Sequence, residues 1–449
     1  MFQNVEPSLK DSARLRGLKR VLSQKAIQRS IGDHLKTRYC KCIDNQQLVW
    51  LIVGLGLFPG KQYRQIFRLL AACWVPVPSS ATITMARKRL SASVLEKLCV
   101  SVIKLLASSP EKHSFAYYKG LRMMSIDGTL LDCPDTDANR KAFGRPSNKT
   151  SNGAFPKARV VSLCELATRV LWRSVIGSYH QNEQKLTQAL LQHLTPNMLL
   201  LADRHFGVAP IIYPLLKRRI GFLIRAKKSQ LFAVEKLLSD GSFLSTIYLG
   251  KNDRRSGRPG KTIRVIRYTH RDPNRPGCGE VHVLLTSLLD AEKYPAVELI
   301  DLYHIRWEEE IAYSEWKVAL GEKKMLRSQS PATVRQEIWG KILSHYIIRT
   351  LIFDAAAVAQ VEPIGISFTG ALDILMARLP DILKSPVKRK RWLTNLINEI
   401  AEEKMPPRAN RINPRKVKKR SQAWPTKRDC DRNPPPPNGN FADQVEMSI

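Results

Sequence analysis

The chain has 449 residues, enough for roughly two or three domains, and its apolar fraction of 43% is that of a folded protein rather than a disordered one. Lys and Arg outnumber Asp and Glu by 73 to 39, and the formal net charge of +34 is too high for a typical metabolic enzyme. This excess predicts a polyanionic partner, with nucleic acid as the first candidate and an anionic membrane as the rival.

Membrane insertion and secretion find little support in the sequence. The longest apolar stretch, residues 48–58, is well short of the roughly 20 residues that span a bilayer. Charges and prolines interrupt the first part of the chain, so we expect no signal peptide and a cytoplasmic protein. The 8 cysteines are scattered, and Cys40 and Cys42 lie close together without completing a zinc-binding pattern.

Residues 1–118 are expected to form a helical N-terminal DNA-binding domain. Helical spacing over residues 64–71 is interrupted by the proline-rich stretch CWVPVPSS, and a second helix resumes with Ser80 as a candidate N-cap. This second helix carries Arg87, Lys88 and Arg89. The basic run is typical either of a DNA-binding module or of the solvated face of a helical bundle, and the sequence leaves both open.

From about residue 119 the pattern changes to alternating strands and helices. The stretch LRMMSIDGT predicts a strand that ends at Asp127, and residues 128–156 read as a loop. A hairpin over 157–179, an amphipathic helix over 182–194 and a buried strand ending at Asp203 follow. Three further strands are predicted within 221–289, and a helical region within 296–380.

Asp127 and Asp203 are therefore both expected at the carboxyl ends of strands. If the two strands are neighbours, their like charges are unfavourable without a cation, and Mg²⁺ suits such oxygen ligands. The alternative is that each aspartate caps the turn after its own strand.

The segment YHIRWEEEIAYSEWK, treated as one continuous helix, collects polar residues on a single stripe. The stripe is formed by Tyr303, Arg306, Glu310 and Lys317. Apolar residues are expected to flank it on two sides, with Trp307, Ile311 and Val318 forming one of these strips. The alternative is a solvated face with ordinary ion pairs, which Glu308 and Glu309 fit.

These residues resemble the motifs of the DDE transposases of the bacterial insertion-element-four family. Asp203 and Phe206 fill the D-x-x-F pattern, and the four-residue stripe fills the family's Y-x2-R-x3-E-x6-K signature. The resemblance covers about 119–350. It implies an α/β fold with a ribonuclease-H-like mixed-sheet catalytic domain over 119–380 and a β-rich insertion at about 208–295. A basic C-terminal region, 381–449, is expected to be partly disordered.

The resemblance also implies an activity and a division of roles. Asp127, Asp203 and Glu310 would be the catalytic, metal-binding carboxylates, holding two Mg²⁺ ions, with Mn²⁺ able to substitute. Tyr303, Arg306 and Lys317 would bind DNA phosphates. The expected partners are double-stranded DNA of the terminal inverted repeats and of the target, with a homodimer as the active complex and the bacterial nucleoid as its location. The expected reaction is cut-and-paste DNA transposition.

The sequence leaves two details of DNA binding open. Some relatives stack a flipped base on a tryptophan of the insertion, but this chain has no Trp between 173 and 306, which leaves Tyr268 or Trp307 as substitutes. Residues 385–428 carry 14 Lys and Arg against three Glu, and we expect this basic tail to contact phosphates non-specifically.

Rival interpretations are a ribonuclease-H-like metal-dependent nuclease without strand transfer, and a catalytically silent DNA-binding derivative. A protein attracted by charge to a membrane surface is a third.

Overall fold

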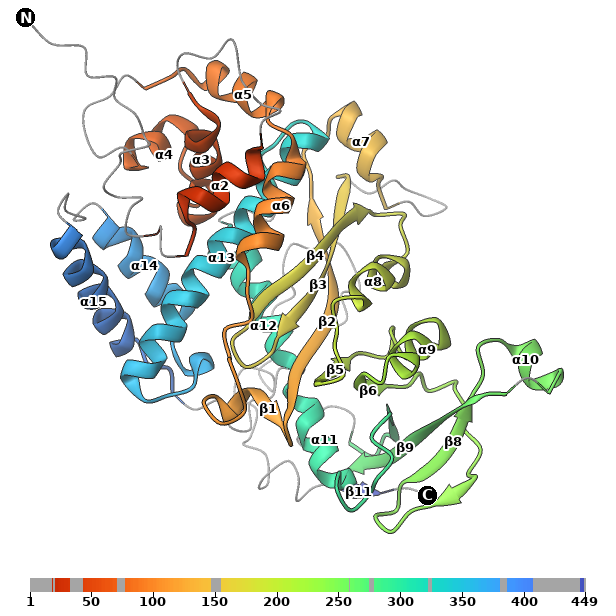
Figure 1. The fold of residues 1–449 in the computed structure, drawn as a ribbon. Coiled ribbons are helices and arrows are strands. Elements are labelled where there is room, and N and C mark those ends of the chain that lie inside the picture. The colour runs from red at the N-terminus through yellow and green to blue at the C-terminus, as the bar shows by residue number, and fades with distance from the viewer. Residues whose placement is uncertain are drawn as a thin grey trace, which may run out of the picture. The chain divides into compact units, whose positions relative to one another are not determined.

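The computed structural model describes residues 18, 21–32, 43–70, 77–146, 155–257, 259–273, 278–321, 325–379, 386–406 and 445–447. The chain forms two compact units, coloured along the sequence in Figure 1. The first unit combines Met1–His193 with Glu308–Met405, and the second combines Leu194–Trp307 with Pro406–Ile449. Each is described in turn.

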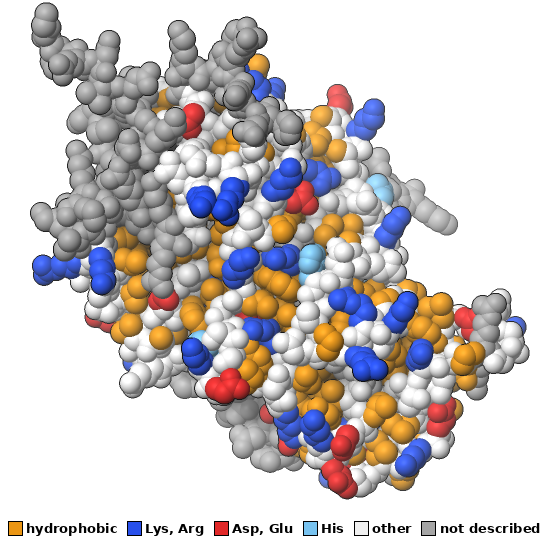
Figure 2. Space-filling model, viewed as in Figure 1, with side chains coloured by type: hydrophobic (Ala, Val, Ile, Leu, Met, Phe, Trp, Pro, Cys, Tyr) orange, Lys and Arg blue, Asp and Glu red, His pale blue; other side chains and the backbone are white. Residues whose placement is uncertain are grey.

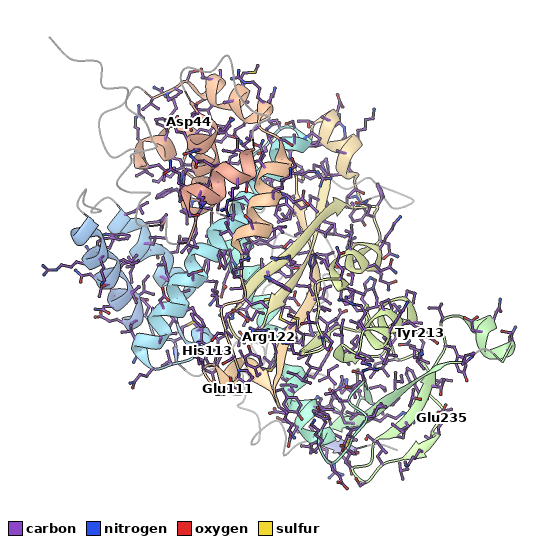
Figure 3. The ribbon with its side chains drawn as sticks, viewed as in Figure 1. Asp44, Glu111, His113, Arg122, Tyr213 and Glu235 are labelled. Atoms are coloured by element: carbon purple, nitrogen blue, oxygen red, sulfur yellow. The ribbon has the colours of Figure 1, made fainter. Side chains whose placement is uncertain are left out.

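The helices of the first unit share one hydrophobic core that joins the two ends of its sequence. A capping box formed by Asp44 and Gln47 fixes the start of α3, and Asp44 is labelled in Figure 3. The helices before the sheet are α2 (Gln24–Ile31), α3 (Asn45–Leu57), α4 (Tyr63–Leu70), α5 (Ser80–Arg89) and α6 (Ala92–Val102). Those after it are α13 (Pro331–Ala359), α14 (Phe368–Arg378) and α15 (Pro386–Glu402).

Helix α13 is the centre of this core. Its length and composition would allow it to span a membrane. However, 67% of its most apolar 18-residue stretch is buried inside the protein, as expected of a core helix. It packs closely against α3 because glycine stands at both contact points. A Cβ on Gly340 would lie 2.6 Å from the carbonyl oxygen of Ile52, and a Cβ on Gly56 would collide with the Ser344 side chain. The N-terminal helices are thus packed on the C-terminal ones rather than separated from them.

The sheet of the first unit is antiparallel, in the order β4–β3–β2, with β1 pairing on β2. The expectation of a strand ending at Asp127 is wrong. β2 continues to Asp132, and Asp127 lies within the ladder opposite Ser162 of β3. The strands and their covering helices are β1 (Tyr117–Tyr118), β2 (Leu121–Asp132), α7 (Asp137–Phe143), β3 (Lys157–Glu165), β4 (Val170–Ser178) and α8 (Glu183–Leu191), with the 3₁₀ turn η3 (Ser114–Ala116) before β1.

A buried ion pair anchors the first residues of β2 to the end of β3. The Arg122 guanidinium, labelled in Figure 3, pairs with Glu165 and also donates to the carbonyl of Ala107 at 2.6 Å. Glu165 accepts in addition from the backbone N–H of Leu106 at 2.9 Å. These bonds satisfy a carboxylate with no exposed surface, which would otherwise be costly to bury.

The second unit carries the sheet β5–β6–β10–β9–β8–β7, with β11 pairing on β9. β5 and β6 are parallel, and the other pairs are antiparallel. The three strands predicted within 221–289 are confirmed as β6, β9 and β10. The elements are β5 (Met198–Ala202), α9 (Ala209–Lys217), β6 (Gly221–Arg225), β7 (Lys236–Leu237), β8 (Phe243–Ile247), α10 (Lys251–Arg255), β9 (Lys261–His270), β10 (His282–Thr286), α11 (Ala296–His304) and β11 (Val445–Met447).

The segment 303–317 is not the single continuous helix expected from its periodicity. α11 ends at His304, a turn follows, α12 runs over Trp307–Ser314, and the π-helix η4 covers Glu315–Ala319. The prediction that Trp307, Ile311 and Val318 form a packed apolar strip is also wrong, because Trp307 is 38% and Val318 69% exposed. A helix that changes its winding at both ends does not keep a stripe at a constant angle.

Candidate active site

Asp127 and Glu310 both belong to the first unit, and contacts of Tyr313 relate the two elements that carry them. The Tyr313 hydroxyl donates a hydrogen bond to the backbone carbonyl of Asp127 at 2.7 Å. Burial raises the pKa of Tyr313, and the nearby carboxylates of Glu309 and Asp127 raise it further. Glu310 lies three residues before Tyr313, so it shares that side of α12. Helix α12 is therefore fixed against β2 at the level of Asp127.

Lys317 also lies near Asp127. Burial lowers the pKa of its ammonium group, and the carboxylates of Asp127 and Asp132 oppose that shift. Lys317 lies in the π-helix η4, one wide turn beyond Tyr313. π-Turns are rare and frequently mark functional sites. The first unit thus brings Asp127, Tyr313 and Lys317 together beside the helix that carries Glu310.

Asp203 and Tyr303 are neighbours in the second unit. Asp203 directly follows β5, as predicted, and its carboxylate accepts from the backbone N–H of His205 at 2.8 Å. The Tyr303 hydroxyl donates to the carbonyl of Ala202 at 3.1 Å. Burial raises the pKa of Tyr303 to about 12, with Arg306 and Arg225 acting in the opposite direction and Asp203 adding to the rise.

Arg306 is packed between aromatic rings rather than displayed on a surface. Only 8% of the residue is exposed, and its guanidinium lies 5.9 Å from the ring centre of Tyr303 and 5.5 Å from that of Trp307. Of the two candidates for base stacking, Tyr268 is 4% exposed whereas Trp307 is 38% exposed. This burial disfavours Tyr268, whose ring also contacts the rings of His270 and His282.

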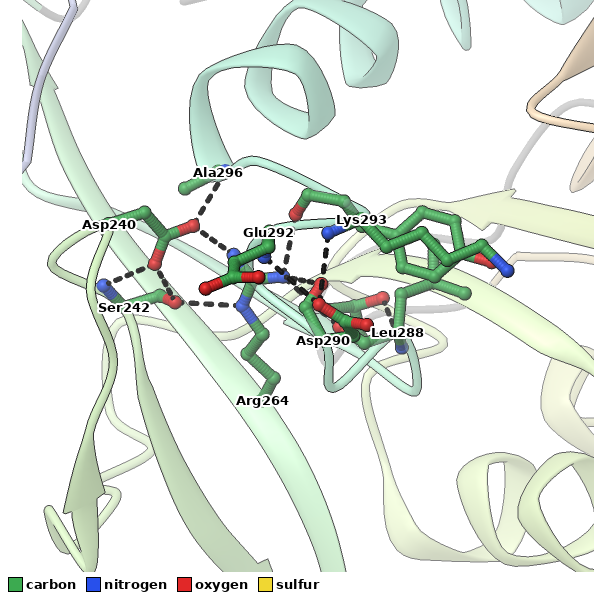
Figure 4. A network of polar contacts seen from close by, with 10 residues as sticks. Asp240, Ser242, Arg264, Leu288, Asp290, Glu292, Lys293 and Ala296 are labelled. Atoms are coloured by element: carbon green, nitrogen blue, oxygen red, sulfur yellow. Dashed lines mark hydrogen bonds and ion pairs between the residues drawn. The ribbon is translucent and has the colours of Figure 1, made fainter.

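A polar network sets the start of α11, the helix that ends beside Tyr303 (Figure 4). The Asp240 carboxylate pairs with Arg264 and accepts from the backbone N–H of Ala296 at 2.8 Å. Arg264 also donates to the carbonyl of Tyr294 at 2.7 Å and to the hydroxyl of Ser242 at 2.7 Å. Such bonds satisfy the free N–H groups at a helix start and fix its direction.

The ends of α12 are held by a second buried network, which sequence analysis did not anticipate. The Arg169 guanidinium donates to Glu308 at 2.5 Å and to Glu315 at 2.9 Å. Glu315 also accepts from Arg349 at 2.9 Å and lies 3.2 Å from the Nε2 of His345. Arg169 sits in the β3–β4 turn with a φ of 55°, in the left-handed region, and is 1% exposed.

Glu308 and Glu309 therefore do not form the solvated face that was the alternative interpretation. Glu308 pairs with Arg169, and Glu309 has no exposed surface. Their neighbours in space come from β3 and from the turn after it, far away in the sequence, so local periodicity could not reveal their burial.

Arg225 is a further residue that sequence analysis did not single out. Ala202 pairs with Ile224 in the parallel β5–β6 ladder, so Arg225 follows at the level of Asp203. Its guanidinium lies 2.5 Å from the Nδ1 of His282. The sequence signal that could have identified Arg225 is a cation placed directly after a buried strand.

The described part of the chain contains no group of three or more His, Cys, Asp and Glu side chains that could hold a metal ion. Asp127 and Glu310 lie in one unit and Asp203 in the other. All three are half-buried carboxylates, the donor type that Mg²⁺ prefers, so the residues present fit a hard divalent cation.

Comparison with known families supplies the deciding observation. The family model for the transposase DDE domain matches residues 118–347, which include all the candidate site residues. The chain belongs to this family. A second model, for the N-terminal region of the insertion element 4 transposase, matches residues 12–99. The protein is thus a DDE transposase of the insertion-element-four family, with a ribonuclease-H-like fold, and it catalyses DNA cleavage and strand transfer.

Two relatives in Escherichia coli agree with this assignment. The transposase is 27% identical over 394 residues to the transposase InsG for insertion sequence element IS4 of Escherichia coli strain K12, covering 85% of this chain and 86% of that protein. The putative transposase InsZ of the same organism is 28% identical over 127 residues, covering 28% of this chain and 42% of that protein. A solved piggyBac transposase synaptic complex with hairpin DNA covers 88% of this chain and 86% of its own, with 12% identity and a TM-score of 0.43.

Proposed function

We propose that this transposase cuts and rejoins DNA at the ends of its insertion sequence with Asp127, Asp203 and Glu310 as the catalytic carboxylates. The observation that carries the proposal is the Tyr313–Asp127 hydrogen bond, because it holds the helix of Glu310 against the strand of Asp127. Oxygen ligands of this kind would bind two Mg²⁺ ions, with Mn²⁺ as a substitute. Bound metal would stabilise the negative charge on the attacking and leaving oxygens of a phosphodiester.

The protein groups around these carboxylates have separate roles in the proposal. Lys317 would hold a DNA phosphate beside Asp127, since its ammonium already lies in the field of that carboxylate. Tyr303 and Arg306 would bind a phosphate beside Asp203 after exchanging the contacts that bury them in the free protein, including the Tyr303 hydrogen bond to the Ala202 carbonyl. Arg306 then offers several donors in a fixed fork. Trp307 offers an exposed ring for a base displaced from the duplex. These contacts orient the DNA backbone for in-line attack by water and then by a 3′-hydroxyl.

The surface charge supports DNA as a partner. Lys and Arg side chains visibly outnumber Asp and Glu on the face shown in Figure 2, which suits a polyanion. The proposed partners are the terminal inverted repeats and target DNA, and the proposed active complex is a homodimer that acts in the bacterial cytoplasm at the nucleoid. Residues 1–118 would bind the ends, and the basic tail would add non-specific affinity.

The test uses purified transposase, Mg²⁺ and duplex DNA that carries the element's own ends. Wild type should cleave at the ends and join the 3′ end to a target, and Asp127→Ala, Asp203→Ala and Glu310→Ala should each lose cleavage while binding the ends. A variant that combines these substitutions should lose little more cleavage activity than a single variant, because each substitution disables the same metal-binding site. Asp301→Ala, an exposed change on α11, is the control. Near wild-type cleavage by any one carboxylate variant removes that residue from the site, and cleavage without joining favours the nuclease alternative.

A further inference from the structure

Helix α5 (Ser80–Arg89) divides into a buried and an exposed face. At about 100° per residue its buried residues fall within an arc of about 100°. They are Ile83, Ala86 and Arg87. The opposite arc carries the exposed residues Ala81, Met85 and Lys88, and the partly exposed Thr84 lies at its edge. The exposed face is small, polar and cationic, with one long apolar side chain, Met85, at 56% exposure.

The buried Arg87 holds α5, and with it the exposed face, in a fixed position. Arg87 donates to the hydroxyl of Tyr63 at 2.6 Å, to the carbonyl of Thr333 at 2.9 Å and to the hydroxyl of Ser328 at 3.1 Å. It is 1% exposed, so the middle residue of the basic run Arg87–Lys88–Arg89 is a structural anchor and not a DNA contact. The sequence-based alternatives of a DNA-binding run and a solvated face both fail for this residue.

The carboxyl end of α5 is tied to the central helix of the unit. The side-chain amide of Gln336 on α13 donates to the carbonyls of Arg87 at 2.7 Å and Leu90 at 2.5 Å. These carbonyls lie at the end of the helix, where internal partners run out. Helix α5 is thereby fixed in direction relative to α13 and to the rest of the first unit.

The surroundings of the exposed face favour a polyanion. No Asp or Glu occurs between Asn45 and Leu95, while the same stretch contains six Lys and Arg. In addition to Lys88 and Arg89 on α5, the exposed side chains of Arg64 and Arg68 lie on helix α4, which packs on α5. A helix face without carboxylates and with flanking cations is complementary to the groove of a nucleic acid duplex.

We propose that the exposed face of α5 enters the major groove of the element's terminal DNA and reads base sequence there. This inference rests on the proposed function and names the element that selects the DNA ends. The Met85 side chain and the Thr84 methyl are suited to thymine methyl groups, and Lys88 to the O6 and N7 acceptors of guanine. The Thr84 hydroxyl already donates to the carbonyl of Ser80 at 2.8 Å, which leaves its methyl for this contact. Arg64, Arg68 and Arg89 would contact phosphates and set the register.

The experiment measures binding without metal, so that it does not depend on catalysis. Duplexes carry an element end, a scrambled sequence of equal composition, or the end with each base pair replaced in turn. For Thr84→Ala/Met85→Ala we expect the ratio of end to scrambled affinity to fall about tenfold or more, with the scrambled affinity almost unchanged. Base pairs contacted by Met85 should become indifferent to replacement in Met85→Ala alone, and they should cluster in one groove segment.

Lys97→Ala is the matched control, because it removes an exposed cation from the neighbouring helix α6. It should lower the affinity for both duplexes equally and leave their ratio intact. The proposal that α5 reads base sequence is overturned if the Thr84→Ala/Met85→Ala variant keeps the wild-type ratio of end to scrambled affinity. It is also overturned if Lys97→Ala lowers that ratio by the same factor. Cleavage of the ends by wild type in Mg²⁺ is scored separately, so either result leaves the proposed carboxylates to be judged on their own. Thermal melting establishes that the variants are folded.

Discussion

The Tyr313 hydroxyl lies 2.7 Å from the backbone carbonyl oxygen of Asp127 and joins α12 to β2. The contact uses the backbone rather than the carboxylate of Asp127. It therefore fixes the position of the strand through its backbone, while the Asp127 carboxylate accepts a separate hydrogen bond from the backbone N–H of Gly128 at 2.7 Å.

Tyr313→Phe should slow strand cleavage by about tenfold without preventing it. Loss of one hydrogen bond costs about 1 kcal/mol of stability, but a small shift of Glu310 relative to Asp127 affects the reaction more strongly. Single-turnover cleavage and chemical unfolding measure the two effects. Tyr346→Phe, which removes an acceptor for the backbone N–H of Lys104, should lower stability similarly with normal cleavage. Equal cleavage rates in the two variants would contradict this positioning role.

Glu315→Gln should destabilise the transposase by about 3–5 kcal/mol near neutral pH, because it leaves buried cations without their shared partner. Burial alone would raise the pKa of Glu315, but Arg349, His345 and Arg169 lower it from 4.5 to about 2. A depressed pKa stabilises the fold above pH 4.5, and this contribution is lost as the pH falls from 4.5 towards 2.

Unfolding curves across that pH interval test the assignment. The difference between wild type and Glu315→Gln should shrink as the pH falls. Glu399→Gln, which breaks a half-exposed pair with Arg378, should cost little at any pH. A constant wild-type advantage down to pH 3 would show that Glu315 does not owe its effect to ionisation.

Lys317→Ala should impair steps after DNA binding more than binding itself. Lys317 lies among carboxylates in the first unit, where it can hold one phosphate but contributes little to total affinity. Strand transfer from pre-cleaved ends should fall at least tenfold, while the end-binding constant changes by about twofold, roughly the effect of one phosphate contact. Lys217→Ala, an exposed change on α9, serves as control. An affinity loss as large as that from neutralising the basic tail would refute this division.

The basic tail needs a different test from simple truncation after Lys384. α15 buries Trp392, Leu396 and Ile400 in the first core, so truncation there would remove part of the fold. Residues 407–428 lie outside the described residues and carry nine Lys and Arg without any Asp or Glu. Replacing these nine with Gln keeps both α15 and β11.

If half of these nine charges contact phosphates, the slope of log affinity against log salt should be less steep by about four in the variant. Titrations of wild type and variant with duplex DNA at several salt concentrations measure this slope. Cleavage at saturating DNA should be retained. An unchanged slope would assign the tail to solubility instead.

Much of the catalytic region was readable from the sequence. The apolar runs before Asp203 and over 221–225 are confirmed as the parallel strands β5 and β6, because buried parallel strands require continuous apolar residues. The hairpin β3–β4 and helix α8 are confirmed as well. The motif spacing over 303–317 led to the family, although it did not describe one straight helix. The roles assigned to Asp127, Asp203, Glu310 and their basic neighbours stay predictions.

What the sequence by itself determined is the kind of molecule: its net charge predicts a polyanionic partner, and its motif residues indicate the family. The tertiary structure alone decided which charged residues are buried. Arg87 looked like a DNA contact but is held by Gln336, 249 residues away, and Glu315 gathers cations from a turn and from α13. Burying a charge is tolerable only where partners satisfy it, and those partners come from distant segments that only the folded chain brings together.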